Sequence, residues 1–172
     1  SSDIARGPGD WHLEFSGFVV PDRLLKAYLL TGREVYFDKA LEFLLAWNAY
    51  EKSQWLPKGL QWNDHALAER VYVLVDFWRT YRGHAKFDAG KAAQILAILE
   101  RSAELLAKPS FFTYATNHGV MENLALMHVG LAVPVLPRAA EYEEIGRTRL
   151  VKQLEFFVSP EGPVLEHSAG YH

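Results

Sequence analysis

Apolar residues recur at intervals of three and four along almost the whole chain, and no stretch alternates between apolar and polar positions as a half-buried strand does. Glycine, proline and polar residues interrupt this pattern at regular places, as helix boundaries do. The spacing predicts six helices, over residues 22–31, 34–50, 63–82, 88–107, 118–132 and 139–157. We therefore expect an all-α fold.

Three of these helices carry one clear apolar face. The faces are formed by Phe37, Leu41, Leu44 and Leu45 in the second helix, by Ile95, Ile98, Leu99, Ser102, Leu105 and Leu106 in the fourth, and by Val120, Leu124, Met127 and Leu131 in the fifth. The helix over 63–82 is apolar on two sides, with Leu67, Val71, Leu74 and Trp78 on one and Ala66, Val73 and Phe77 on the other. A helix of that kind is expected between two layers.

The helices pair into three αα-hairpins, with turns expected near Gly32, Gly83 and Gly130, which are 51 and 47 residues apart. Hairpins stacked at such a period form an open solenoid or a closed α/α toroid. The expected organisation is an N-terminal segment (1–21), an αα-hairpin domain forming part of a toroid (22–158) and a loop (159–172). Two prolines and two glycines forbid a helix in that last stretch.

Composition narrows the function without identifying it. The chain has 172 residues, 49% hydrophobic and 23% charged, as ordinary globular domains do. A net charge of −3 argues against nucleic-acid and membrane partners, which require a dominant positive field. No run is long and apolar enough for a membrane span, and the chain has no Cys, which excludes thiolate chemistry and Cys-based zinc sites.

Three segments concentrate groups capable of chemistry: WNDHALAER (62–70), TNHGVMEN (116–123) and LEHSAGYH (165–172). In the second, Asn117 lies where a helix begins, so its side chain either caps that helix or donates its amide to a substrate carboxylate beside His118. His118 and Glu122 share a helical face, but no third ligand at a recognised spacing completes a metal site. We expect no metal and no cofactor.

The first segment also has a structural interpretation. Asp64 or Asn63 suits a helix cap, His65 and Glu69 are four residues apart, and an internal ion pair is the default for the charged groups. In the third segment, Tyr171 stands in a glycine-containing loop close to Glu166, His167, Ser168 and His172. Several proton-handling groups thus gather where no helical core can form.

These segments together resemble the heparinase II/III-like polysaccharide lyases, a superfamily that also includes alginate lyases. The resemblance rests on Asn-His-Gly at 117–119, on E-x-S-x-x-Y-H formed by Glu166, Ser168, Tyr171 and His172, and on the 54 residues between Asn117 and Tyr171. The segment W-x-D-H-x-x-x-x-R at 62–70 and the stretch YLLTGREVYFDKALEFLLAW are also similar to the family.

The resemblance implies a helical toroid followed by a β-sandwich region beyond residue 172, with the active site between the two. It implies β-elimination at a uronic acid of an anionic polysaccharide or oligosaccharide. By the same resemblance, Asn117 neutralises the substrate carboxylate, His118 is its neighbour or a base, and Tyr171 protonates the departing oxygen and acts as base in a syn reaction. A periplasmic or secreted bacterial protein is expected.

The residues expected to bind substrate or to supply positive charge near Tyr171 are Arg70, His65, Glu166, His167 and His172. The chain has no basic cluster, so an unsulfated or weakly sulfated uronate polymer is the expected substrate. Two alternatives stay open. One is a toroidal glycoside hydrolase that uses two carboxylates, for which the candidates are Glu122, Glu166 and Asp64. The other is a non-catalytic αα-solenoid in which Asn117 is a cap and Tyr171 packs.

Overall fold

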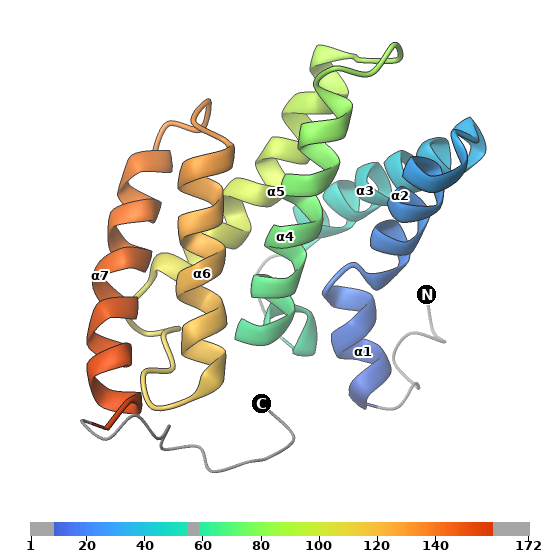
Figure 1. Ribbon diagram of the computed structural model, residues 1–172. Coiled ribbons are helices and arrows are strands. Elements are labelled where there is room, and N and C mark those ends of the chain that lie inside the picture. Colours follow the sequence, from blue (N-terminus) through green and yellow to red (C-terminus); the bar gives the residue numbers. More distant parts are fainter. Residues whose placement is uncertain (1–8, 55–58, 160–172) are drawn as a thin grey trace.

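The computed structural model describes residues 9–54 and 59–159, and in these residues seven α-helices follow one another without a β-strand (Figure 1). The helices are α1 (Gly9–Ser16), α2 (Val19–Thr31), α3 (Glu34–Ser53), α4 (Asp64–Tyr81), α5 (Ala89–Ala107), α6 (Asn117–Ala132) and α7 (Ala139–Phe157). A 3-10 helix, η2 (Leu60–Trp62), precedes α4. The expected all-α fold is confirmed.

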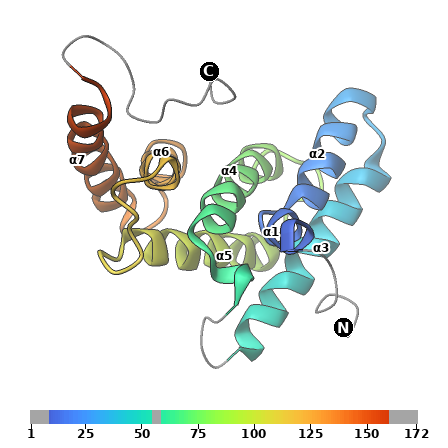
Figure 2. The same ribbon diagram turned by 90° about the horizontal axis from the view of Figure 1, so that it is seen from below.

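Consecutive helices form three antiparallel hairpins, α2–α3, α4–α5 and α6–α7, that stack side by side (Figure 2). α4 packs against α2 on one side and α6 on the other, and α5 likewise contacts both α3 and α7. The middle hairpin is therefore the centre of the stack, which explains why α4 is buried along much of its circumference. The closure of such hairpins into a toroid stays a prediction.

The N-terminal part contains helix that the apolar pattern did not predict. Residues 9–16 form α1, and α2 begins at Val19, three residues before its expected start, with Pro21 in its first turn. Proline is tolerated there because first-turn amides have no partner within the helix. Between the two helices Phe18 adopts a left-handed conformation with φ of 69° and is wholly buried.

α6 buries a different face from the predicted one. Leu124 and Leu131 of the expected apolar line are 42% and 65% exposed, whereas Glu122 and Asn123 are fully buried. Apolar residues of α6 occur on all sides of the helix, so their periodicity alone could not show which side is buried. The turn expected near Gly130 follows α6 directly, over residues 133–138, and Gly130 itself lies inside α6, where a Cβ would collide with Glu143 of α7.

No helix among residues 9–54 and 59–159 is long and apolar enough to cross a membrane.

Candidate functional site

The N-terminal ends of α4 and α6 lie next to each other at one end of the hairpin stack (Figure 1). Asn63 caps α4 by accepting a hydrogen bond from the His65 amide at 3.0 Å. Thr116 caps α6 by accepting one from the Gly119 amide at 3.4 Å. Because Thr116 performs this role, the alternative in which Asn117 is the cap is wrong.

Asn117 is the first residue of α6, and its half-buried side chain makes no hydrogen bond with any described residue. Its amide is thus free to meet a ligand at the start of the helix. The adjacent backbone amides of a first helical turn carry a partial positive charge, which favours an anion at this position. The position of Asn117 therefore fits its predicted contact with a substrate carboxylate.

His118 faces two residues of α4. Its Nδ1 lies 3.4 Å from Oδ1 of Asp64, within ion-pairing distance, and its ring centroid lies 5.2 Å from that of His65. The His118 side chain is 44% exposed, whereas that of Asp64 is only 12% exposed. A solvent-accessible imidazole is therefore held against a mostly buried carboxylate, the arrangement that orients a histidine for proton transfer.

Close to Asp64 lies a second carboxyl group, that of Glu122, whose burial the sequence did not predict. Glu122 is fully buried, and its Oε1 lies 2.6 Å from the Thr113 hydroxyl oxygen and accepts a hydrogen bond from the Thr113 amide at 3.3 Å. Burial raises the pKa of Glu122, although the hydrogen bonds from Thr113 oppose this effect. A glutamate in this position cannot contact a glycan, which removes it from the carboxylate pair that the glycoside hydrolase alternative needs.

Gly119 makes this close arrangement possible. A Cβ at this position would collide with the Thr113 carbonyl oxygen and would lie 2.5 Å from Nε2 of Gln153. Only glycine therefore lets the first turn of α6 approach the loop that carries Thr113. The glycine of the Asn-His-Gly motif has a packing reason that its position in the sequence did not reveal.

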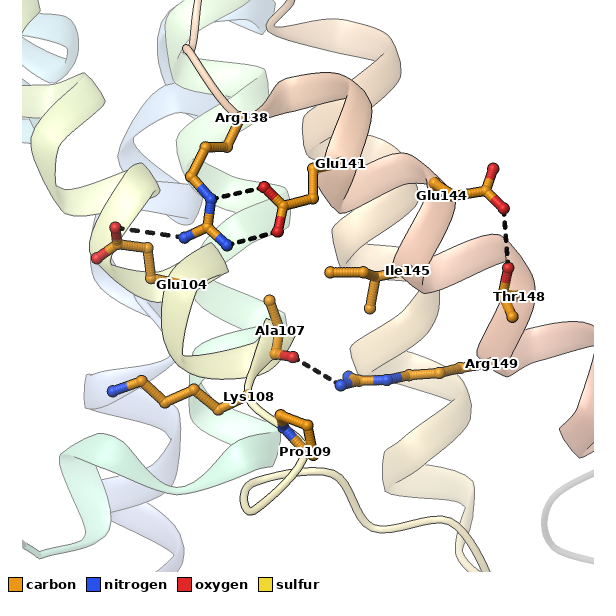
Figure 3. Close-up of a pocket in the computed structure, with 10 residues that line it drawn as sticks. All are labelled: Glu104, Ala107, Lys108, Pro109, Arg138, Glu141, Glu144, Ile145, Thr148 and Arg149. Atoms are coloured by element: carbon orange, nitrogen blue, oxygen red, sulfur yellow. Dashed lines mark hydrogen bonds and ion pairs between the residues drawn. The ribbon is translucent and has the colours of Figure 1, made fainter.

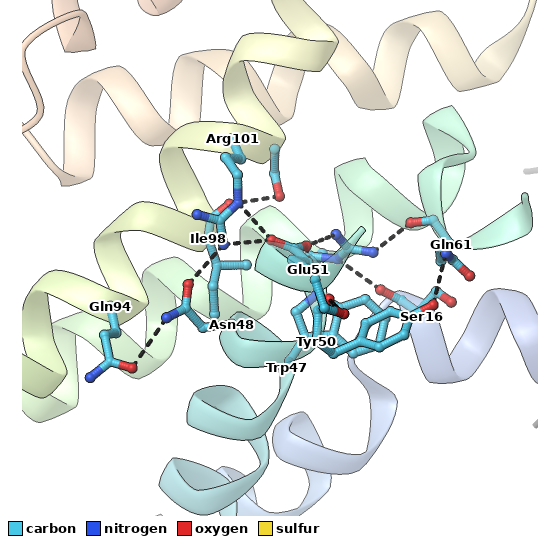
Figure 4. A network of polar contacts seen from close by, with 12 residues as sticks. Ser16, Trp47, Asn48, Tyr50, Glu51, Gln61, Gln94, Ile98 and Arg101 are labelled. Atoms are coloured by element: carbon cyan, nitrogen blue, oxygen red, sulfur yellow. Dashed lines mark hydrogen bonds and ion pairs between the residues drawn. The ribbon is translucent and has the colours of Figure 1, made fainter. Parts of the chain in front are cut away.

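Arg70 lies elsewhere, and its predicted contact with substrate is not supported by its position. The side chain is fully buried and donates to Oε1 of Glu51 at 2.8 Å, to the Ser16 carbonyl at 2.9 Å and to the Gln61 carbonyl at 2.6 Å. Figure 4 shows this network, in which Arg101 also donates to Glu51. Arg70 therefore ties α3, α4 and the two short helices together, as the internal ion-pair interpretation expected.

The remaining predicted residues, Glu166, His167, Tyr171 and His172, lie outside the described residues. His65 is among the described residues, and its ring lies beside that of His118 in the candidate site. Within the described ranges, no group of three or more His, Asp or Glu side chains is arranged to hold a metal ion.

Two cavities differ in whether a predicted site residue lines them. One of about 710 Å³ lies between α5 and α7, where Arg138 pairs with Glu141 and Arg149 donates to the Ala107 carbonyl (Figure 3). It contains none of the predicted site residues. Another, of about 510 Å³, lies between α2 and α4 and includes His65 in its wall. We regard the second cavity as relevant because it adjoins the imidazole pair.

The fold and site define a helical-hairpin domain that presents an amide, two imidazoles and a carboxylate at adjacent helix N-termini. Comparison with known families gives this class a name, since residues 11–172 match the family described as Heparinase II/III N-terminus. The chain belongs to that family of heparinase-type polysaccharide lyases. No curated protein and no solved structure matched the chain significantly.

Proposed function

We propose that this chain forms part of the active site of a polysaccharide lyase that cleaves a uronic-acid-containing glycan by β-elimination. The observation that carries the proposal is the pairing of His118 with Asp64, beside the uncommitted amide of Asn117, at the N-terminal ends of α4 and α6. Membership of the heparinase II/III N-terminal family supports a polysaccharide as the substrate.

In this reaction a base removes the C5 proton of the uronate, electrons shift to form the C4–C5 double bond, and the C4–O bond breaks. The C5–H is a very weak acid, so the enzyme must stabilise the negative charge that develops on the adjacent carboxylate. Asn117 suits this task because its amide can donate to that carboxylate while the first turn of α6 adds favourable electrostatic potential.

Proton transfer is assigned to His118 and Tyr171. His118 takes the C5 proton in one sugar epimer, and Tyr171 gives a proton to the departing glycosidic oxygen and serves as base where the geometry is syn. Tyr171 follows the last residue of α7 by 14 positions. The end of α7 and the start of α6 lie at the same end of their hairpin (Figure 1). A chain of that length spans at most about 50 Å, enough to return to His118. The further acid or base comes from the predicted β-sandwich region.

The cavity beside His65 supports an unsulfated or weakly sulfated substrate. Its wall contains more carboxylates than cations: Glu14, Asp22, Glu69 and Asp76 against Arg23 and Lys26. Lys26 is also paired with Asp22 at 2.8 Å. Sulfate groups require several uncommitted Arg or Lys side chains. A glycan whose neighbouring sugars present hydroxyl groups fits this wall better.

The test is an assay of uronate polymers with the protein that carries this chain, following the ultraviolet absorbance of the new double bond. Asn117→Ala and Tyr171→Phe are each expected to lower kcat by at least about a hundredfold, because each removes a group that acts in the transition state. Thr148→Val, on the exposed side of α7, is the matched control and should retain the activity.

Two outcomes contradict the proposal. New reducing ends without ultraviolet absorbance indicate a glycoside hydrolase, since hydrolysis creates no double bond. Full activity in both Asn117→Ala and Tyr171→Phe means that the chemistry lies elsewhere in the protein.

A further inference from the structure

A single hydroxyl group lies between the two carboxyl groups at the base of the site. The Thr113 Oγ1 is 2.6 Å from Oε1 of Glu122 and 3.2 Å from Oδ2 of Asp64. The other oxygen of Asp64, Oδ1, lies 3.4 Å from Nδ1 of His118. A continuous line of polar contacts thus runs from the buried interior of α6, through the loop before it, to the exposed imidazole.

This line requires a specific arrangement of hydrogens. A threonine hydroxyl has one hydrogen, so it can donate to only one of two carboxylates and accepts from a donor on its other side. If both carboxyl groups were ionised, one contact would join two acceptors without a hydrogen between them. One carboxyl group must therefore carry a proton, which also removes the repulsion between like charges.

Burial decides which group carries the proton. Glu122 is fully buried, and its Oε2 has no hydrogen-bond partner among the described residues, whereas Asp64 retains some exposure and faces His118. An ionised oxygen without a partner in the interior is very costly. The charged groups that face Glu122 are Asp64 on α4 and Arg149 on α7, and these two oppose each other in their effect on its pKa.

We propose that Glu122 and Thr113 are positioning residues for His118: protonated Glu122 donates to Thr113, Thr113 donates to Asp64, and ionised Asp64 holds Nδ1 of His118. The inference rests on the proposed function and deepens it. With Nδ1 directed at Asp64, Nε2 is left as the nitrogen that can take a proton from substrate. The His65 ring also packs against this imidazole, with 5.2 Å between the two ring centroids.

Kinetics of the protein that carries this chain provide the first test. Thr113→Val keeps the shape of the side chain but removes the hydroxyl, and should lower kcat about tenfold to a hundredfold, the usual effect of losing a hydrogen bond to a charged group. KM should remain the same, because Thr113 does not contact substrate. Thr113→Ser restores the hydroxyl and should recover most of the rate.

The acid at the end of the line is tested in the same way. Glu122→Leu should reproduce the loss of kcat, and Glu122→Gln should recover most of it, because the glutamine amide can donate to Thr113 as the protonated acid does. If Glu122→Gln is as impaired as Glu122→Leu, the assigned proton is wrong. Thr148→Val controls for the loss of a threonine hydroxyl outside the site.

A second measurement does not depend on lyase activity. The ¹⁵N chemical shifts of the His118 ring report which nitrogen carries the hydrogen, and they should show the Nδ1–H tautomer in the unmodified protein and in Thr113→Ser. Thr113→Val should give a mixture of tautomers. An unchanged tautomer in Thr113→Val overturns the positioning role, even if the protein proves to be a lyase. If the ¹⁵N chemical shifts of His118 behave as expected but the protein has no lyase activity, only the proposed function is overturned.

Discussion

Glu51 lies between two arginines in the interior, and its replacement by glutamine is expected to destabilise the fold strongly. Oε1 of Glu51 accepts from Arg70 at 2.8 Å and from Trp47 at 2.6 Å, and Oε2 accepts from Arg101 at 2.8 Å (Figure 4). Both Glu51 and Arg70 have fully buried side chains. Glutamine keeps the size of the side chain but removes the negative charge that both guanidinium groups face.

The magnitude follows from the charge that remains. Burial lowers the pKa of Arg70 to about 10, which Glu51 opposes, so the guanidinium is still charged at neutral pH. Removing one partner of a buried ion pair costs about 3–5 kcal/mol. In a domain of this size 1 kcal/mol changes the melting temperature by roughly 2–4 °C, so Glu51→Gln should melt about 6–20 °C lower.

Thermal unfolding followed by circular dichroism measures this shift. Glu141→Gln is the matched control, because Glu141 pairs with Arg138 on the exposed side of α7 and should melt like the unmodified protein. A loss in Glu51→Gln no greater than the roughly 2–4 °C expected for 1 kcal/mol would falsify the reasoning. In that case, water or a rearranged Arg70 compensates the missing charge.

Three further predictions concern α6. Gly119→Ala should lower the free energy of unfolding in urea by about 1–3 kcal/mol, since its Cβ collides with the preceding loop, whereas Gly83→Ala meets no atom within 4 Å and should not. Thr116→Ala should lower the free energy by about 1 kcal/mol through loss of the N-cap, while Asn117→Ala should leave it almost unchanged; the reverse order would restore the capping role of Asn117. Burial raises the pKa of Glu122 in the fold, so its protonated form stabilises the protein at low pH and this contribution is lost as pH rises through the raised value. The melting temperature of Glu122→Gln relative to the unmodified protein should therefore increase from acidic to neutral pH, and a constant difference contradicts the protonated state.

Several elements could be predicted from the sequence because their causes are local. Gly32 ends α2 in a left-handed conformation with φ of 66°, which glycine adopts without strain, and the turn falls where it was expected. The apolar stripe of α5, from Ile95 to Leu106, is buried as its spacing indicated. The two motifs that contain His65 and His118 were also identified from the sequence, and the rings of these two histidines lie side by side.

The sequence by itself thus determined the helices α2 to α7, most of their turns and the residue types of the candidate site, since a period of 3.6 residues and the backbone preferences of glycine act within a few positions. Only the tertiary structure decided which polar groups are buried. Arg70 is structural because Glu51 of α3 pairs with it, and Glu122 points inward because the Thr113 hydroxyl and amide lie within hydrogen-bonding distance of its Oε1 there. A polar side chain enters a core only where distant parts of the chain supply its partners, and local periodicity carries no information about those partners.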